Sequence, residues 1–198
     1  MALAKKKGKK MTLKEIKTKI YALLDTSEGD ELLSNALAPA IDSAAKKTAF
    51  YTRCMKKRAM LQFLSENGKA SAALPNDMAS FCYIEAGRER YGREYFDIID
   101  GKIYSKAFGA GVFELVYAAF PPTIGAGTDD KTELALGEYA CDIVCYGAAM
   151  ELCSCVHPND AQRYMRLATE YDERMANLLT AASECRSVAN KFFGGDII

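Results

Sequence analysis

Residues 136–179 read LGEYACDIVCYGAAMELCSCVHPNDAQRYMRLATEYDERMANLL and set the predicted architecture. The first part predicts a helix over residues 136–156, about 30 Å long. Pro158 cannot continue it, and Asn159 followed by Gln162 is typical of the start of a second helix, which we expect to reach about Cys185. Because the connecting turn is short, the two helices are predicted to form an antiparallel pair.

Two more helices are predicted upstream of this pair. Thr12 and Glu15 have the spacing of a capping box, so a helix is expected to begin there and to end near residues 25–29. A second helical segment is predicted from Asp30 to about Glu66. We expect Pro39 to kink or break it, because proline lacks the backbone donor that a helix needs.

The middle of the chain has the signals of short strands. Asp100-Gly101 lies between Ile98-Ile99 and Ile103-Tyr104, which is a strong hairpin signal. Residues 112–117 are typical of a strand, and Pro121-Pro122 closes it. The pattern predicts a small antiparallel insertion at about residues 77–121.

The predicted fold class is therefore mainly α: an antiparallel helical bundle with a small inserted antiparallel β-hairpin or sheet, and flexible N- and C-terminal arms. A basic flexible arm is expected over residues 1–11 and a single bundle domain over residues 12–186, leaving a tail over residues 187–198.

Cations gather in two places. The first twenty residues hold eight lysines and one acid, which favours an arm that faces a polyanion such as DNA, or else a solvated terminus. The candidate DNA-facing residues of the arm are Lys5, Lys6, Lys7, Lys9 and Lys10. A basic helix over residues 46–58 is either a solvated face or a surface for a neighbouring subunit or DNA. Its cations are Lys46, Lys47, Arg53, Lys56, Lys57 and Arg58.

The seven cysteines are odd in number, and no long apolar stretch follows the first lysines. We therefore expect reduced thiols in a chain that folds in the cytosol. The most apolar stretch, residues 134–156, is interrupted by Glu138, Asp142 and Glu151, which argues against a membrane span.

No catalytic constellation is apparent. His157 is the only histidine, and at a predicted helix end it is more typical of a dipole partner than of a base. The strongest metal candidate is the set Cys141, Cys145, Cys153 and His157. These residues spread widely around one helix, whereas zinc ligands usually come in close pairs from two elements. We expect no enzyme activity, no metal and no cofactor, with a zinc protein as the weaker hypothesis.

The C-terminal tail has the character of a docking peptide. Apolar anchors flank Gly194-Gly195, and exposed apolar groups on a flexible segment are costly unless they dock. The anchors are Phe192, Phe193, Ile197 and Ile198.

Over residues 55–180, the order of several loose motifs resembles the head-to-tail adaptor, or connector, proteins of tailed bacteriophages. A helix is followed by Leu74-Pro75-Asn76-Asp77-Met78 and then by the strand Phe81–Glu85. The hairpin Ile98–Ile103 and the strand Val112–Pro121 follow, and an Ala-rich helix, a Pro-Asn-Asp-Ala turn and a helix with Tyr164 and Tyr171 complete the order. The longer N-terminal segment, residues 1–40, departs from the short members of the family.

The resemblance implies a structural virion protein without catalytic residues. Such proteins form a ring, usually of twelve copies, under the portal protein, which they bind through a C-terminal segment. Their other surface meets tail, tail-hub or nozzle proteins, and double-stranded DNA passes through the channel. The chain would be made in the host cytoplasm and reside at the portal vertex, with no membrane partner.

Two further hypotheses follow from the residues. A ring interface joins two different surfaces, and an acidic helix over residues 170–184 against the basic helix over residues 46–58 would supply them. The alternative function is a nucleic-acid-binding protein that uses the lysine-rich N-terminus and the same basic helix.

Overall fold

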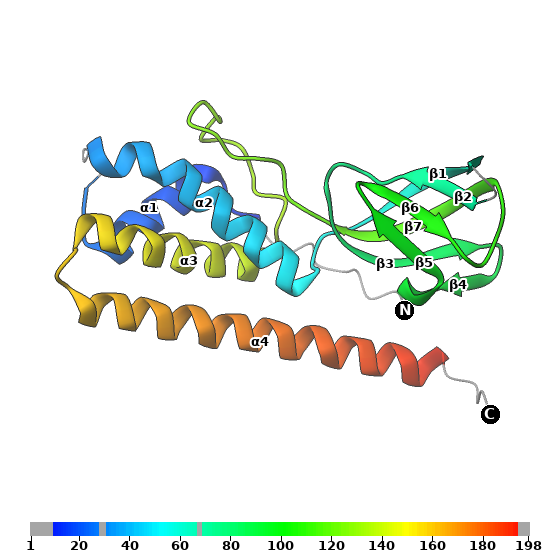
Figure 1. Ribbon diagram of the computed structural model, residues 1–198. Helices are drawn as coiled ribbons and strands as arrows, with labels where there is room; N and C mark the ends of the chain where they lie inside the picture. Colours follow the sequence, from blue (N-terminus) through cyan, green and yellow to red (C-terminus); the bar gives the residue numbers. More distant parts are fainter. Residues whose placement is uncertain (1–9, 28–30, 67–68, 194–198) are drawn as a thin grey trace. The chain divides into compact units, whose positions relative to one another are not determined.

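The computed structural model describes residues 10–27, 31–66 and 69–193 of the chain (Figure 1). The chain divides into two compact units. A helical unit consists of residues 1–52 and 122–198, and a β unit consists of residues 53–121.

The helical unit contains α1 (Leu13–Leu24), α2 (Glu31–Thr52), α3 (Glu138–Val156) and α4 (Ala161–Phe193). The predicted capping box of α1 is confirmed: the Glu15 amide donates to the Thr12 hydroxyl at 3.3 Å, and the Thr12 amide donates to the Glu15 carboxylate at 2.7 Å. At the start of α4, the Arg163 amide donates to Asp160 Oδ1 at 2.9 Å. Asp160 therefore caps this helix in place of the predicted Asn159.

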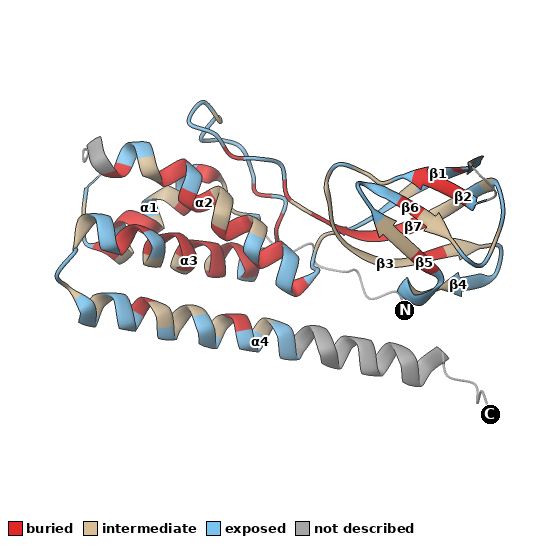
Figure 2. Cartoon of the chain, in the orientation of Figure 1, coloured by how far each residue is buried: buried red, intermediate tan, exposed pale blue. Residues whose placement is uncertain are grey.

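Helix α3 is the core of the helical unit. It packs against α1, α2 and α4, and buried residues line most of its length (Figure 2). Among the described helices, α3 alone is long and apolar enough to cross a membrane by length and composition, a test that the core helix of a soluble protein also passes. Its many buried contacts are those of a core helix.

The β unit contains seven strands within the described residues. They are β1 (Lys56–Glu66), β2 (Lys69–Ala73), β3 (Met78–Ala86), β4 (Glu89–Tyr91), β5 (Phe96–Ile99), β6 (Lys102–Ser105) and β7 (Gly111–Ala119). They form one antiparallel sheet in the order β4-β3-β7-β1-β2-β6-β5.

The sheet is curled into a half-barrel, and β1 links its two halves. The first part of β1 pairs with β7 and its last three residues pair with β2. The inner face holds a core of buried apolar side chains that includes Phe63, Ile84, Phe96 and Leu115. The ring of Phe108 contacts Phe63 and Phe96 edge to face, so a segment between strands completes the core.

The predicted fold class is therefore wrong. The protein is mixed α/β: its described residues form four α-helices and a large antiparallel sheet in place of a small hairpin inserted at about residues 77–121. The difference lies in residues 53–66, for which the sequence pattern predicts the second half of a long helix. Arg53 has a left-handed backbone (φ 49°) just after α2 ends at Thr52, and the chain then continues as β1.

The long predicted helix also differs in its interior. Helix α2 continues through Pro39 without a break.

The predicted Asp100-Gly101 hairpin is confirmed: Ile98 pairs with Ile103 and Ile99 with Lys102. Both turn residues have positive φ, 49° and 74°, as a two-residue turn of this hand requires.

The two predicted arms lie largely outside the described residues. Of the arm over residues 1–11, only Lys10 and Met11 are described. The tail was expected to begin at residue 187, whereas helix α4 extends to Phe193. Residues 194–198 lie outside the described residues.

Candidate interaction surfaces

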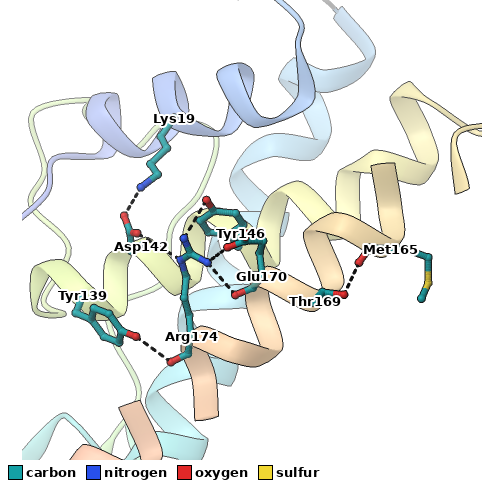
Figure 3. Close-up of polar contacts among 8 residues, drawn as sticks. All are labelled: Lys19, Tyr139, Asp142, Tyr146, Met165, Thr169, Glu170 and Arg174. Atoms are coloured by element: carbon teal, nitrogen blue, oxygen red, sulfur yellow. Dashed lines mark hydrogen bonds and ion pairs between the residues drawn. The ribbon is translucent and has the colours of Figure 1, made fainter. Parts of the chain in front are cut away.

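A network of ion pairs around Asp142 holds three helices of the helical unit together (Figure 3). Lys19 of α1 forms an ion pair with Asp142 of α3, and Arg174 Nε of α4 lies 3.8 Å from Asp142 Oδ2. Arg174 is also paired with Glu170, and its guanidinium lies 4.1 Å from the centre of the Tyr146 ring. These contacts join α4 to the other two helices, and we call them the Asp142 network.

The two cations of this network, Lys19 and Arg174, are balanced by two anions, Asp142 and Glu170. Burial opposes the charged form of Arg174, but the hydrogen bond to Glu170 and the nearby Tyr146 and Asp142 raise the pKa of Arg174 above its ordinary value. Arg174 thus stays cationic, and the network has the properties of a structural tie between helices.

Cys145 lies beside the network on α3. Burial raises the pKa of the Cys145 thiol to about 12. A thiol with this pKa is protonated at neutral pH, so Cys145 behaves as a small apolar side chain and is no nucleophile.

The predicted metal candidates are part of the packing. Cys141, Cys145 and Cys153 are buried on α3. His157 ends α3, and its Nε2 lies 2.6 Å from the Leu24 carbonyl at the end of α1. Within residues 10–27, 31–66 and 69–193, no group of three or more His, Cys, Asp or Glu side chains is placed to hold a metal ion.

The predicted basic patch is divided between the two units. Lys46 and Lys47 belong to α2, whereas Lys56, Lys57 and Arg58 belong to β1. The basic helix over residues 46–58 therefore does not exist, because the helix ends at Thr52.

Most cations of this set already have acidic partners within their own unit. Lys46 lies 2.7 Å from Asp42, and Lys47 lies 3.7 Å from Glu151. Lys57 lies 2.6 Å from Asp77, while Arg58 contacts both Glu85 and Glu114. Arg53 and Lys56 are exposed and make no ion pair with the part of the chain that the structure describes.

The other predicted site residues are described only in part. Lys10 lies 3.8 Å from Glu133, and Lys5, Lys6, Lys7 and Lys9 lie outside the described residues. The backbone of Phe192 and Phe193 forms the end of α4, but their side chains are not described, and Ile197 and Ile198 lie outside the described residues.

A surface of apolar and charged side chains covers the outer side of β1 and β7, where Glu114 stands opposite Met60. Lys56, Arg58, Met60 and Leu64 alternate with the buried Leu61 and Phe63, so they point away from the core. Val112 joins them because its neighbour across the ladder is Gln62. Met60, Leu64 and Val112 are 64%, 54% and 59% exposed. We call Lys56, Arg58, Met60, Leu64 and Val112 the β1 face.

A second apolar surface lies on one side of α4. Met165, Asp172 and Leu179 are spaced by seven residues, so they lie on one line along the helix, and Tyr164 lies next to it. Tyr164, Met165 and Leu179 are 42%, 62% and 41% exposed. Figure 3 shows Met165 pointing away from the Asp142 network. We call Tyr164, Met165, Asp172 and Leu179 the α4 stripe.

Sequence reasoning missed both surfaces. The helical segment predicted from Asp30 to about Glu66 includes Met60 and Leu64, although the alternation from Ala59 to Leu64 also fits a strand. The Asn67-Gly68 dipeptide was the available signal for a hairpin, because Glu66 pairs with Lys69 on either side of it.

No model of a known protein family matches this chain, and no curated protein matches it.

Proposed function

We propose that the chain is a structural virion protein similar to head-to-tail adaptors. It forms a ring under the portal protein, joins the capsid to the tail and lets DNA pass. The observation that carries this proposal is the pair of unlike exposed apolar surfaces, the β1 face and the α4 stripe. A ring needs two different complementary surfaces on every copy, since a contact between two like surfaces stops at a dimer.

The positions of the motifs support the same proposal. The segment Phe81–Glu85 lies in β3, the Ile98–Ile103 segment forms the β5–β6 hairpin, and Val112–Ala119 lies in β7. Helices α3 and α4 follow in the expected order. The first element of the resemblance, a helix before Leu74, is not formed, because β1 and β2 occupy residues 56–66 and 69–73.

The proposal includes the partners and the place of action. The partners are further copies of the chain, the portal protein, tail or nozzle proteins, and the passing double-stranded DNA. The protein is made in the host cytoplasm, acts at the portal vertex of the virion, and neither performs catalysis nor binds a membrane.

Cryo-electron microscopy of phage particles that carry the encoding gene tests this function. We expect a ring of copies between the portal and the tail, and we expect deletion of the gene to give DNA-filled heads without tails. Supplying the wild-type gene from a plasmid is the control and should restore the tails. Particles whose portal vertex lacks the chain would contradict the proposal.

The alternative, a nucleic-acid-binding protein, has less support. Lys46, Lys47, Lys57 and Arg58 are neutralised by acidic side chains of the same chain. A nucleic-acid surface needs cations that are free to displace counterions from phosphates. Binding of purified protein to duplex DNA, strong at low salt and steeply weakened by added salt, would favour this alternative.

A further inference from the structure

We propose that the β1 face of one copy binds the α4 stripe of a second copy. This inference rests on the proposed function, which requires copies of the chain to contact one another, and it names the surfaces that do so. It replaces the hypothesis of a basic helix against an acidic helix, since residues 53–58 are not helical.

Both surfaces carry exposed apolar side chains. Met60, Leu64 and Val112 stand on the β1 face, and each is more than half exposed. Tyr164, Met165 and Leu179 stand on the α4 stripe. Burying these side chains against one another removes apolar area from water, which is the main source of association free energy. Methionine suits such a contact because its flexible thioether adapts to irregular surfaces.

The charges of the two surfaces are opposite. Lys56 on the β1 face and Asp172 on the α4 stripe are both exposed, and neither makes an ion pair within the described part of the chain. The other cation of the β1 face, Arg58, is neutralised by Glu85 and Glu114. One free cation therefore faces one free anion, and the pair can set the register of the contact.

The spacing along the two elements is also compatible. Lys56 and Met60 are about 13 Å apart at the usual rise of a strand. Asp172 lies about 10 Å from Met165 in one direction and from Leu179 in the other. Placing Lys56 beside Asp172 thus brings Met60 close to one of the two apolar residues of the stripe.

Contact between the β1 face of one copy and the α4 stripe of another is favoured over contact between two like surfaces. Two α4 stripes in antiparallel contact would bring the Asp172 carboxylates together, because Asp172 lies midway between Met165 and Leu179. Contact between unlike surfaces avoids this repulsion and leaves one of each surface free on every dimer, so that further copies can add.

Substitution of the apolar residues provides the first test. Met60→Asp and Met165→Asp should each raise the dissociation constant of self-association about tenfold or more, measured by sedimentation velocity of the full chain. The matched control is Ile99→Asp on β5, because Ile99 is 56% exposed but lies outside both surfaces. The control should associate like wild type, and circular dichroism should show that all three variants are folded.

Exchange of the charges provides the second test. Lys56→Asp alone and Asp172→Lys alone should weaken association, and the double variant should recover most of the wild-type affinity. A double variant as weak as the product of the two single effects, or a wild-type chain that stays monomeric at every concentration, would overturn the inference.

The outcomes separate this inference from the proposed function. A ring at the portal vertex that still forms with Met60→Asp and Met165→Asp would overturn the inference and leave the proposed function in place. Self-association through these two surfaces by a chain that is absent from the vertex would support the inference and end the proposed function.

Discussion

Gly147 of α3 lies close to side chains of both α2 and α4. A Cβ atom at this position of α3 would lie 3.0 Å from the Tyr171 ring of α4 and 3.3 Å from the Ala44 Cβ of α2. Glycine therefore allows α3 to pack tightly against both neighbours at one level.

Replacing this glycine should loosen the helical unit. Gly147→Val is expected to lower the free energy of unfolding by about 2 kcal/mol or more, because the added methyl groups force Tyr171 and α2 apart. Urea denaturation measures the change. Gly127→Val is the control, since a Cβ there meets nothing within 4 Å, and it should alter stability by less than about 0.5 kcal/mol. Equal effects of the two substitutions would contradict this account.

Arg174 is the central cation of the Asp142 network. Arg174→Gln removes its contacts with Asp142, Glu170 and the Tyr146 ring, and should destabilise the protein by about 1 kcal/mol, a modest value because the group is partly solvated. Thermal unfolding measures the loss. Arg166→Gln is the control, since Arg166 is exposed on the same helix and makes no ion pair with the described residues. A loss as large in the control would show that the network adds nothing specific.

At the scale of elements, the strands β1, β3 and β7 are joined by one carboxylate. Asp77 lies just before β3. Its side chain accepts hydrogen bonds from Lys57 of β1 at 2.6 Å and from the Tyr117 hydroxyl of β7 at 3.0 Å. The hydrogen bond from Lys57 holds the pKa of Asp77 below its ordinary value, although burial acts in the opposite direction.

The lowered pKa of Asp77 predicts a pH-dependent stability. The carboxylate stabilises the fold above its unfolded pKa of about 3.9, and this contribution is lost as the pH falls through the lower folded pKa. Asp77→Asn should therefore be less stable than wild type at neutral pH, and the difference should shrink in acid. Urea denaturation across this pH range measures it. A pH-independent difference for Asp77→Asn would refute the link.

The elements differ in how far the sequence could specify them. Thr12 with Glu15 and Asp100 with Gly101 are local signals, since the residues that form each feature are adjacent in the chain, and both features were predicted correctly. Strand β1 could not be assigned this way. Its residues fit a helical stripe and a strand alternation alike, and its pairing with β7 depends on residues about fifty positions away.

The candidate surfaces were hidden for the same reason. Met60 is exposed because β1 is a strand whose alternate residues, Leu61 and Phe63, are buried. Predicting a helix for these residues therefore also predicted the wrong set of exposed side chains. The partners of Lys57 and Arg58 were equally unpredictable, since Asp77, Glu85 and Glu114 reach them only through the order of the sheet.

At the scale of the whole molecule, the β unit has the features of an independently folding domain. It contains its own core, and its two ends are joined by a hydrogen bond from the Ala119 amide to the Met55 carbonyl at 2.8 Å. We expect a fragment of residues 53–121 to give the circular dichroism of a β protein and to unfold cooperatively. A fragment of residues 53–110 is the control and should not fold, because it lacks β7 from the middle of the sheet. An unfolded 53–121 fragment would contradict this expectation.

The position of the two connections also determines how the β unit responds to mechanical load. The chain enters the sheet at Lys56 and leaves it just after Ala118, and these two residues are partners in the β1–β7 ladder. Tension that pulls α2 away from residues 122–137 would act across this first rung and open the ladder one pair at a time, like a zipper. Because the pairs break singly and not all at once, the β1–β7 ladder resists such tension weakly.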